Sequence, residues 1–305
     1  MPSVTSIETW NERFAIPGVA RIVAGEGNLS KVQVTTPAAL AELYVHGAQL
    51  TSWRPAGHEE VIFLSKDSRF EDGKAIRGGI PVCFPWFRGK ADDPKAPAHG
   101  FVRTKSWELE SITQEHESVV VTLTTESDEA SRRWWSHDVR VAHRVTVGSE
   151  LKLELVVTNT GSTPLQFEEA LHTYYLVGDA EKIRVAGLDG TRYLDNMDGN
   201  REKVQSGDAI LTAPTDNAYL NTTGALDLID PVLRRRVHIE KKNSLSTVVW
   251  NPWQEGAKKL ADLGDDEWRQ MACVEASNIL SCAVVLAPGE EHTLAVTMRV
   301  TTEDA

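Results

Sequence analysis

The fold is indicated most clearly by residues 139–157, which read V-R-V-A-H-R-V-T-V-G-S-E-L-K-L-E-L-V-V. Apolar side chains occupy alternate positions on both sides of Gly148-Ser149, first mostly as valines and then mostly as leucines. A period of two places such side chains on one face of a strand, and a short Gly-containing break between two such runs is typical of a hairpin turn. The segment therefore predicts two adjacent antiparallel strands with one buried face.

The same alternation recurs along the chain, whereas helical patterning is scarce. Further strand-like runs are found at residues 32–44, 119–125, 164–177, 235–240, 247–250, 281–286 and 293–301. Only residues 254–271 have a helical pattern, and Gly256 and Gly264 weaken it. Strands that follow strands without intervening helices favour antiparallel sheets packed face to face. Since no repeat, linker or charge block marks a boundary, we expect an all-β fold, a large antiparallel β-sandwich with few short helices, forming one domain over residues 1–305.

The composition argues against several classes of partner. The chain has 44 acidic and 32 basic residues, and its formal net charge of −12 disfavours nucleic acid and anionic membranes. Its three cysteines form neither a disulfide framework nor a zinc-type spacing, which fits a reducing compartment. No signal-peptide pattern is found, and no apolar run reaches the roughly 18 residues of a membrane span. We therefore expect a cytoplasmic monomer that binds neither nucleic acid nor membrane.

The most unusual segment is residues 76–88, which read I-R-G-G-I-P-V-C-F-P-W-F-R. Glycine permits backbone conformations barred to other residues, and proline cannot donate to a sheet ladder, so we expect a shaped loop. Arg77 would offer a guanidinium that suits phosphate, and the rings of Phe84, Trp86 and Phe87 would suit the C–H face of a sugar. A core plug rich in proline and aromatic residues is the alternative for this segment.

One histidine lies on a polar strand face. Within the run 164–177, alternation places His172 on the same face as glutamine, glutamate and tyrosine side chains. This face is expected to line a polar groove, although a solvated sheet edge would also fit. The neighbouring carboxylates Glu168 and Glu169 are candidates for holding His172 protonated.

Two further side chains are placed by their neighbours. Glu275 lies within the small, apolar run 271–278, where partial desolvation would raise the pKa of a carboxyl group towards that of a useful general base. An outward-pointing carboxylate on a strand is the alternative.

His143 falls on the apolar face of its strand and is expected to be a core histidine. The sequence has no H-x-H pair, H-E-x-x-H motif or Cys/His cluster, so it predicts no metal site.

Six short motifs follow one another along the chain. They read R-G-G-I-P with F-P-W-F from residue 77, H-G-F-V-R from 99, L-H-T-Y-Y from 171, T-D ahead of a tyrosine from 215, V-W-N-P-W from 249 and C-V-E-A-S-N from 273. In this order they resemble the hexose-6-phosphate mutarotases (glucose-6-phosphate 1-epimerases) of the galactose-mutarotase-like superfamily. The resemblance covers roughly residues 20–300.

The resemblance implies a galactose-mutarotase-like supersandwich whose concave face holds the sugar. It implies interconversion of the α and β anomers of an aldohexose 6-phosphate, with glucose 6-phosphate as the expected substrate and with neither metal nor cofactor. His172 would be the general acid and Glu275 the general base. Arg77 and Arg103 would contact the substrate, including its phosphate. Asp216 would accept hydrogen bonds from sugar hydroxyls, and His99 would be a second histidine that contacts the sugar. Trp86 would lie in the pocket wall.

Two positions depart from the family pattern. Ala98 stands where members often have glutamine, which predicts one hydrogen bond fewer to the substrate, and Arg88 inserts a cation between Phe87 and Gly89. Either change is expected to bear on sugar preference. Three alternatives stay open: an aldose 1-epimerase acting on unphosphorylated sugar, a non-catalytic carbohydrate-binding sandwich, and a glycosidase with Asp216 and Glu275 as its paired carboxylates.

Overall fold

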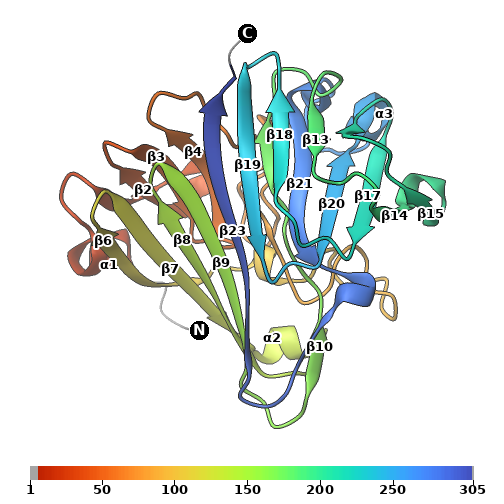
Figure 1. Ribbon diagram of the computed structural model, residues 1–305. Helices are drawn as coiled ribbons and strands as arrows, with labels where there is room; N and C mark the ends of the chain where they lie inside the picture. The colour runs from red at the N-terminus through yellow and green to blue at the C-terminus, as the bar shows by residue number, and fades with distance from the viewer. Residues whose placement is uncertain (1–5, 304–305) are drawn as a thin grey trace.

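The computed structural model describes residues 6–303, and its largest element is a nine-stranded sheet (Figure 1). The strand order is β16-β13-β18-β19-β23-β9-β8-β7-β6. The strands are β6 (Glu108–Glu115), β7 (Ser118–Glu126), β8 (Val139–Val147), β9 (Glu150–Asn159), β13 (Arg184–Ala186), β16 (Ala209–Ile210), β18 (Leu226–Asp230), β19 (Arg235–Lys242) and β23 (Glu291–Thr302).

An eight-stranded sheet carries most of the sequence motifs. It contains β5 (Val82–Cys83), β11 (Glu169–Leu171), β12 (Tyr174–Leu176), β14 (Arg192–Asp195), β15 (Arg201–Val204), β17 (Thr215–Leu220), β20 (Ser246–Asn251) and β21 (Met271–Asn278). A four-stranded sheet consists of β1 (Ala20–Ala24), β2 (Ser30–Thr35), β3 (Ala39–Tyr44) and β4 (Gln49–Pro55), and a two-stranded ribbon pairs β10 (Leu165–Phe167) with β22 (Val284–Leu286).

Helices are few and short. They are α1 (Ile7–Phe14), α2 (Glu129–Arg132) and α3 (Trp253–Ala257), with single 3₁₀ turns η1 (Glu26–Asn28), η2 (Val102–Thr104), η3 (Asn196–Asp198), η4 (Glu267–Gln270) and η5 (Leu280–Cys282). Within residues 6–303, none of these helices has the length and apolar character needed to span a membrane.

The nine-stranded sheet packs against both of the larger partner sheets. His143 on β8 contacts the Ala48 carbonyl beside the four-stranded sheet through Nδ1, at 2.9 Å. Tyr175 on β12 donates its hydroxyl to the sulfur of Met298 on β23 at 3.5 Å. The apolar faces of the three sheets form one continuous buried cluster between them. This arrangement confirms the predicted antiparallel β-sandwich and the core position of His143.

Three of the strand-like runs had wrong bounds. Residues 32–44 are a hairpin, not one strand, because the turn at Pro37 is closed by the Thr36 N–H donating to the Ala39 carbonyl at 2.9 Å. Residues 164–177 are broken into β10, β11 and β12. Residues 281–286 begin within η5 and are a strand only over β22. The weak helical pattern at 254–271 forms only α3 and η4, as expected where two glycines interrupt it.

The outer face of the eight-stranded sheet is the part of the fold that matters for function. Along β21, Val274 and Ala276 turn into the common core, so Glu275 between them must face the opposite way. On β20, Val249 packs into the core, while Val248 and Trp250 belong to small clusters on the outer face. The sheet therefore separates a dry core from an outer face bearing polar groups.

Candidate active site

A pocket of about 250 Å³ opens on this outer face. Six of the seven residues predicted to form the site line it: Arg77, His99, Arg103, His172, Asp216 and Glu275. A larger cavity of about 680 Å³ lies elsewhere, beside β9 and β23, and is lined by none of these six residues. The pocket, not the larger cavity, is thus where the separate sequence motifs converge.

The loop at 76–88 and the loop around His99 are joined by backbone hydrogen bonds beside the pocket. The Phe84 N–H donates to the His99 carbonyl at 3.3 Å, and the His99 N–H donates to the Arg88 carbonyl at 2.7 Å. Gly100 follows with a φ of +74°, and a Cβ there would lie 1.8 Å from the Phe84 carbonyl oxygen. Only glycine fits this crossing, which explains the glycine after His99. The predicted loop at 76–88 also contains β5, a two-residue strand paired with β11.

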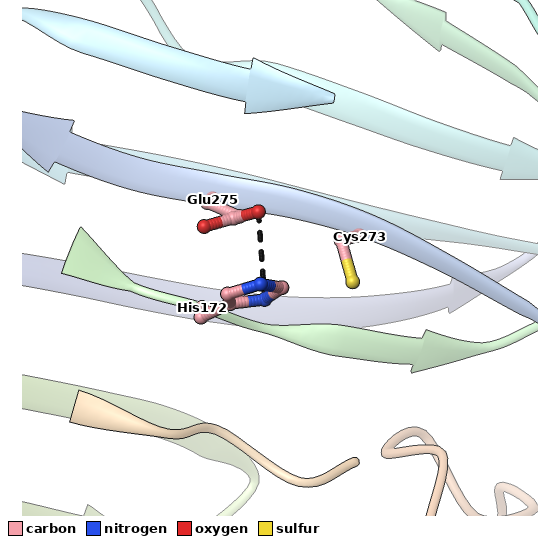
Figure 2. Close-up of side chains that lie close together, drawn as sticks. All are labelled: His172, Cys273 and Glu275. Atoms are coloured by element: carbon pink, nitrogen blue, oxygen red, sulfur yellow. Dashed lines mark ion pairs between the residues drawn. The ribbon is translucent and has the colours of Figure 1, made fainter. Parts of the chain in front are cut away.

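The centre of the pocket is a histidine–glutamate pair from neighbouring strand segments (Figure 2). The register pairs Leu171 with Ala276 and Tyr174 with Cys273, which places His172 beside Glu275. Nδ1 of His172 lies 3.4 Å from Oε1 of Glu275. The two residues are only 6% and 1% exposed. The polar groove and the semi-buried carboxylate predicted separately from sequence are one site.

Burial acts on both members of this pair in opposite directions. Desolvation raises the pKa of Glu275 well above its ordinary value, and the nearby Asp216 carboxylate raises it further. Desolvation also lowers the pKa of His172 well below its ordinary value, and the guanidiniums of Arg103 and Arg77 add to that effect. Within residues 6–303, neither Glu275 oxygen has a hydrogen-bond partner. The two groups are thus close, at 3.4 Å, but not hydrogen-bonded to each other, and both are almost fully shielded from water.

Tyr174 orients this histidine from one side. Its ring stacks on His172 with 4.8 Å between centroids and 9° between planes. Nη1 of Arg77 donates to the Tyr174 hydroxyl at 3.0 Å, while Nε of Arg77 donates to Asp262 at 3.1 Å. Sequence reasoning did not assign Tyr174 or Asp262. The alternation of residues 164–177 places Tyr174 on the same strand face as His172, so this pattern could have identified Tyr174. Asp262 lies in an irregular segment, where no sequence pattern pointed to the site.

His99 also packs against His172. The two imidazole centroids are 5.5 Å apart and nearly edge-on, and Phe87 packs edge-on against His99 at 4.7 Å. Burial, followed by the positive charge of Arg103, lowers the pKa of His99 well below its ordinary value. His99 therefore presents a neutral ring, suited to hydrogen bonding with a sugar hydroxyl.

The three arginines of the pocket differ in how they are paired. Arg77 pairs with Asp262, and Nη2 of Arg88 donates to Oδ1 of Asp216. Arg103 donates only to the Ala98 carbonyl, at 3.0 Å, and its buried Nε has no partner within the described residues. Arg103 is the pocket arginine that lacks a carboxylate partner in this part of the chain, so it is the one best placed to receive an anion.

Asp216 is held on both oxygens. Oδ1 accepts from Arg88, the inserted cation, and Oδ2 accepts from Nδ2 of Asn196 at 2.7 Å. Asn196 lies on η3, far from the motifs in sequence, and was not anticipated. A sugar hydroxyl that bonds to Asp216 must share these oxygens with Arg88 and Asn196.

One residue expected in the pocket wall does not line the pocket. Trp86 is not among its lining residues, because its indole N–H donates to the Pro97 carbonyl at 2.9 Å and its ring packs edge-on against Phe101. Phe87 lines the pocket in its place.

The expected support of His172 by adjacent carboxylates was also wrong. Glu168 accepts from the backbone N–H groups of Phe87 and Leu280, and Glu169 pairs with His292 at 2.9 Å. Both carboxylates are committed to partners other than His172.

One group of side chains has the geometry of metal ligands. His172, Cys273 and Glu275 each offer a ligand atom, and these atoms all lie within 4.8 Å of one another. Sequence spacing did not reveal the group, because the histidine comes from one segment and the C-x-E pair from another strand.

Comparison with known proteins agrees with this architecture. A family model described as aldose 1-epimerase matches residues 30–299. The chain belongs to the aldose 1-epimerase family. Over 272 residues it is 34% identical to a proposed glucose-6-phosphate 1-epimerase of Salmonella typhimurium, covering 87% of this chain and 90% of that protein. A protein of Cenchrus ciliaris with the same description is 34% identical over 82% of this chain and 78% of its own length.

Solved structures give the same picture. The crystal structure of a proposed mutarotase from Salmonella typhimurium superposes with a TM-score of 0.89 at 30% identity, covering 95% of this chain and 96% of that one. Galactose 1-epimerase from Lactobacillus acidophilus superposes with a TM-score of 0.69 at 15% identity, over 93% and 99% of the two chains. The latter likeness concerns the fold, which confirms the galactose-mutarotase-like sandwich.

Proposed function

We propose that this member of the aldose 1-epimerase family interconverts the α and β anomers of an aldohexose 6-phosphate, with glucose 6-phosphate as the substrate. One observation carries the proposal: the buried His172–Glu275 pair shares its pocket with Arg103, which lacks a carboxylate partner within residues 6–303. The His172–Glu275 pair provides proton transfer, and Arg103 provides a site for phosphate. The names of the relatives support the same substrate.

The reaction requires one proton to be removed and another to be supplied. To open the ring, a base takes the proton of the anomeric hydroxyl while an acid protonates the ring oxygen O5 as the C1–O5 bond breaks. The aldehyde end rotates, and closure on its other face reverses both transfers. Two groups that hold one transferable proton between them, 3.4 Å apart and sheltered from water, meet this need.

Phosphate binding favours His172 as the acid. The guanidiniums of Arg103 and Arg77 lower the pKa of His172 in the free site. A phosphate bound to them would offset that positive field and raise the pKa of His172, which favours its protonated form. We therefore assign His172 as the acid that protonates O5 and Glu275, as the other member of the pair, as the base at the anomeric hydroxyl. When the ring closes, the two residues exchange roles.

The phosphate itself is held without a glycine-rich phosphate loop. Guanidinium groups make charge-assisted and often bidentate hydrogen bonds to phosphate, so Arg103 is the primary contact. Arg77 contributes its positive charge while it stays paired with Asp262. Asp216 and His99 remain for the hydroxyl groups of the sugar ring.

Anomerisation can be followed directly. Freshly dissolved α-glucose 6-phosphate changes optical rotation as it equilibrates, and the protein is expected to accelerate this change. The rates should be compared with those for glucose, galactose and galactose 6-phosphate. Faster turnover of the free sugars would instead favour an aldose 1-epimerase for unphosphorylated sugar. Unchanged equilibration of all four, with sugar still bound, would favour a carbohydrate-binding sandwich.

Other expectations from the sequence stay predictions. They are a single domain over residues 1–305, a monomeric state and a cytoplasmic location. The three free, buried cysteines support a reducing compartment.

A further inference from the structure

A thiol lies beside the catalytic pair and has no part in the acid–base chemistry. Cys273 and Glu275 are two residues apart on β21 and therefore share a strand face. Cys273 pairs in register with Tyr174, so its sulfur lies near the ring of His172, as Figure 2 shows. The three ligand atoms lie within 4.8 Å of one another, and Cys273 is fully buried.

Several polar atoms of this cluster are unsatisfied. Within the described part of the chain, Nδ1 of His172 and both carboxylate oxygens of Glu275 lack hydrogen-bond partners. Buried polar atoms are ordinarily paired, and an unpaired group in a native protein calls for a physical explanation. Proton transfer explains the histidine and the glutamate but does not require a cysteine beside them. An ion that accepts nitrogen, oxygen and sulfur ligands could be bound by His172, Glu275 and Cys273 together.

We propose that His172, Cys273 and Glu275 bind a thiophilic divalent cation such as Zn²⁺, and that the bound ion blocks the active site. Zn²⁺ takes thiolate, imidazole and carboxylate ligands at about 2.0–2.3 Å, which places tetrahedral ligand atoms about 3.5 Å apart. His172 and Glu275 already meet this separation at 3.4 Å. The widest separation in the group must shorten by about 1 Å to reach it.

The charges around the site are compatible with a dication. The two anionic ligands, a thiolate and a carboxylate, balance the charge of the ion, and binding displaces the thiol proton and any proton held by the Glu275 carboxyl group. Arg77 and Arg88 are each paired with a carboxylate, which leaves Arg103 as the repelling charge of the pocket. Hard, oxygen-preferring ions such as Mg²⁺ and Ca²⁺ gain nothing from the thiolate and should not bind here.

Metal binding can be tested without any measurement of turnover. Co²⁺ is the probe, because a cobalt–thiolate bond gives an intense near-ultraviolet charge-transfer band. The wild-type protein is expected to bind one Co²⁺ with this band, and Zn²⁺ should displace it. Cys273→Ala should abolish the band and weaken binding by about tenfold or more. Cys273→Ser serves the same purpose if the alanine variant does not fold.

The matched control is Cys282→Ala, which removes another buried thiol that lines the larger cavity. This variant should keep both the band and the affinity of the wild type. No band in the wild-type protein, or a band that persists in both Cys273 variants, would overturn the proposal.

The inhibitory effect rests on the proposed function and is measured separately. Zn²⁺ should abolish anomerisation by the wild-type protein, a chelator should restore it, and Cys273→Ala should be active and at least about tenfold less sensitive to Zn²⁺. A protein that shows the cobalt–thiolate band but never anomerises sugar phosphate would refute the proposed function and leave the metal site standing. Equal sensitivity of the wild-type and Cys273→Ala proteins would refute the inhibitory role.

Discussion

At the scale of single residues, Arg103 is the side chain that should distinguish a phosphorylated sugar from a free one. Replacing it by alanine removes a charge-assisted contact worth roughly 1.5–3 kcal/mol, so we expect KM for the hexose 6-phosphate to rise about 10- to 100-fold. Any turnover of free hexose should change little. Arg132→Ala is the matched control, because that arginine is exposed and pairs with Asp138. Equal losses on both substrates would remove the phosphate role.

The ionisation of His172 gives a second prediction at this scale. Because Arg103 and Arg77 lower its pKa, either adding inorganic phosphate or replacing Arg103 by alanine should raise it. NMR titration of the imidazole protons measures the shift. In the Arg103→Ala variant, phosphate should have a smaller effect than in the wild type. A pKa that phosphate leaves unmoved would contradict the assignment of the acid and base roles.

Where local pattern and motif agreed, the sequence pointed to residues that the structure brings together. His172 and Glu275 were each found from an unusual side chain on a strand face, and the structure brings them together. Trp86 could not be distinguished from Phe87, because a loop has no fixed period to say which side chain faces the pocket. Asp262 and Asn196 reach the site through tertiary packing of irregular segments, which local sequence does not report.

At the scale of elements, the loop crossing at Gly100 should be intolerant of any side chain. Gly100→Ala would strain a positive φ and drive Cβ into the Phe84 carbonyl, so we expect a loss of about 2 kcal/mol or more in the free energy of unfolding. Gly89→Ala is the control, because nothing lies within 4 Å of a Cβ there. Chemical denaturation of both variants provides the comparison. Similar stabilities would show that the crossing is not rigid.

Strand β8 gives a pH-dependent prediction. Burial lowers the pKa of His143 to about 4, below the roughly 6.5 of an unfolded histidine. The unfolded chain therefore gains this proton first as pH falls, so the stabilising contribution is full above pH 6.5 and is lost towards pH 4. The loss is about 3 kcal/mol.

Comparison with His143→Gln isolates this contribution. The variant should show a flatter dependence of the free energy of unfolding on pH between 6.5 and 4. Parallel pH profiles of the wild type and the variant would contradict the prediction.

Element boundaries were harder to predict than element types. The 139–157 hairpin was clear because both strands alternate cleanly around a short turn. The 32–44 and 164–177 runs look continuous in sequence, but a local turn divides the first into two strands and the second is divided among three. Hydrophobic period identifies a strand but does not say where pairing with its neighbour ends.

At the scale of the whole molecule, the eight-stranded sheet of the sandwich forms the base of the site. The eight-stranded sheet is covered on one face by the common core and carries the proposed proton-transfer groups on the other. The predominance of antiparallel strands was predictable, because a period of two recurs throughout the chain. The division into a nine-stranded, an eight-stranded and a four-stranded sheet was not, since it depends on which distant strands pair.

The most direct test is the exchange rate between the anomeric protons of glucose 6-phosphate, measured by two-dimensional NMR exchange spectroscopy. The wild-type protein should accelerate exchange, and Glu275→Gln should lose about 10²- to 10⁴-fold of that acceleration while staying folded. Glu169→Gln is the matched control, because that buried glutamate lies outside the pocket and pairs with His292. It should retain exchange. Near-normal exchange with Glu275→Gln would contradict the account.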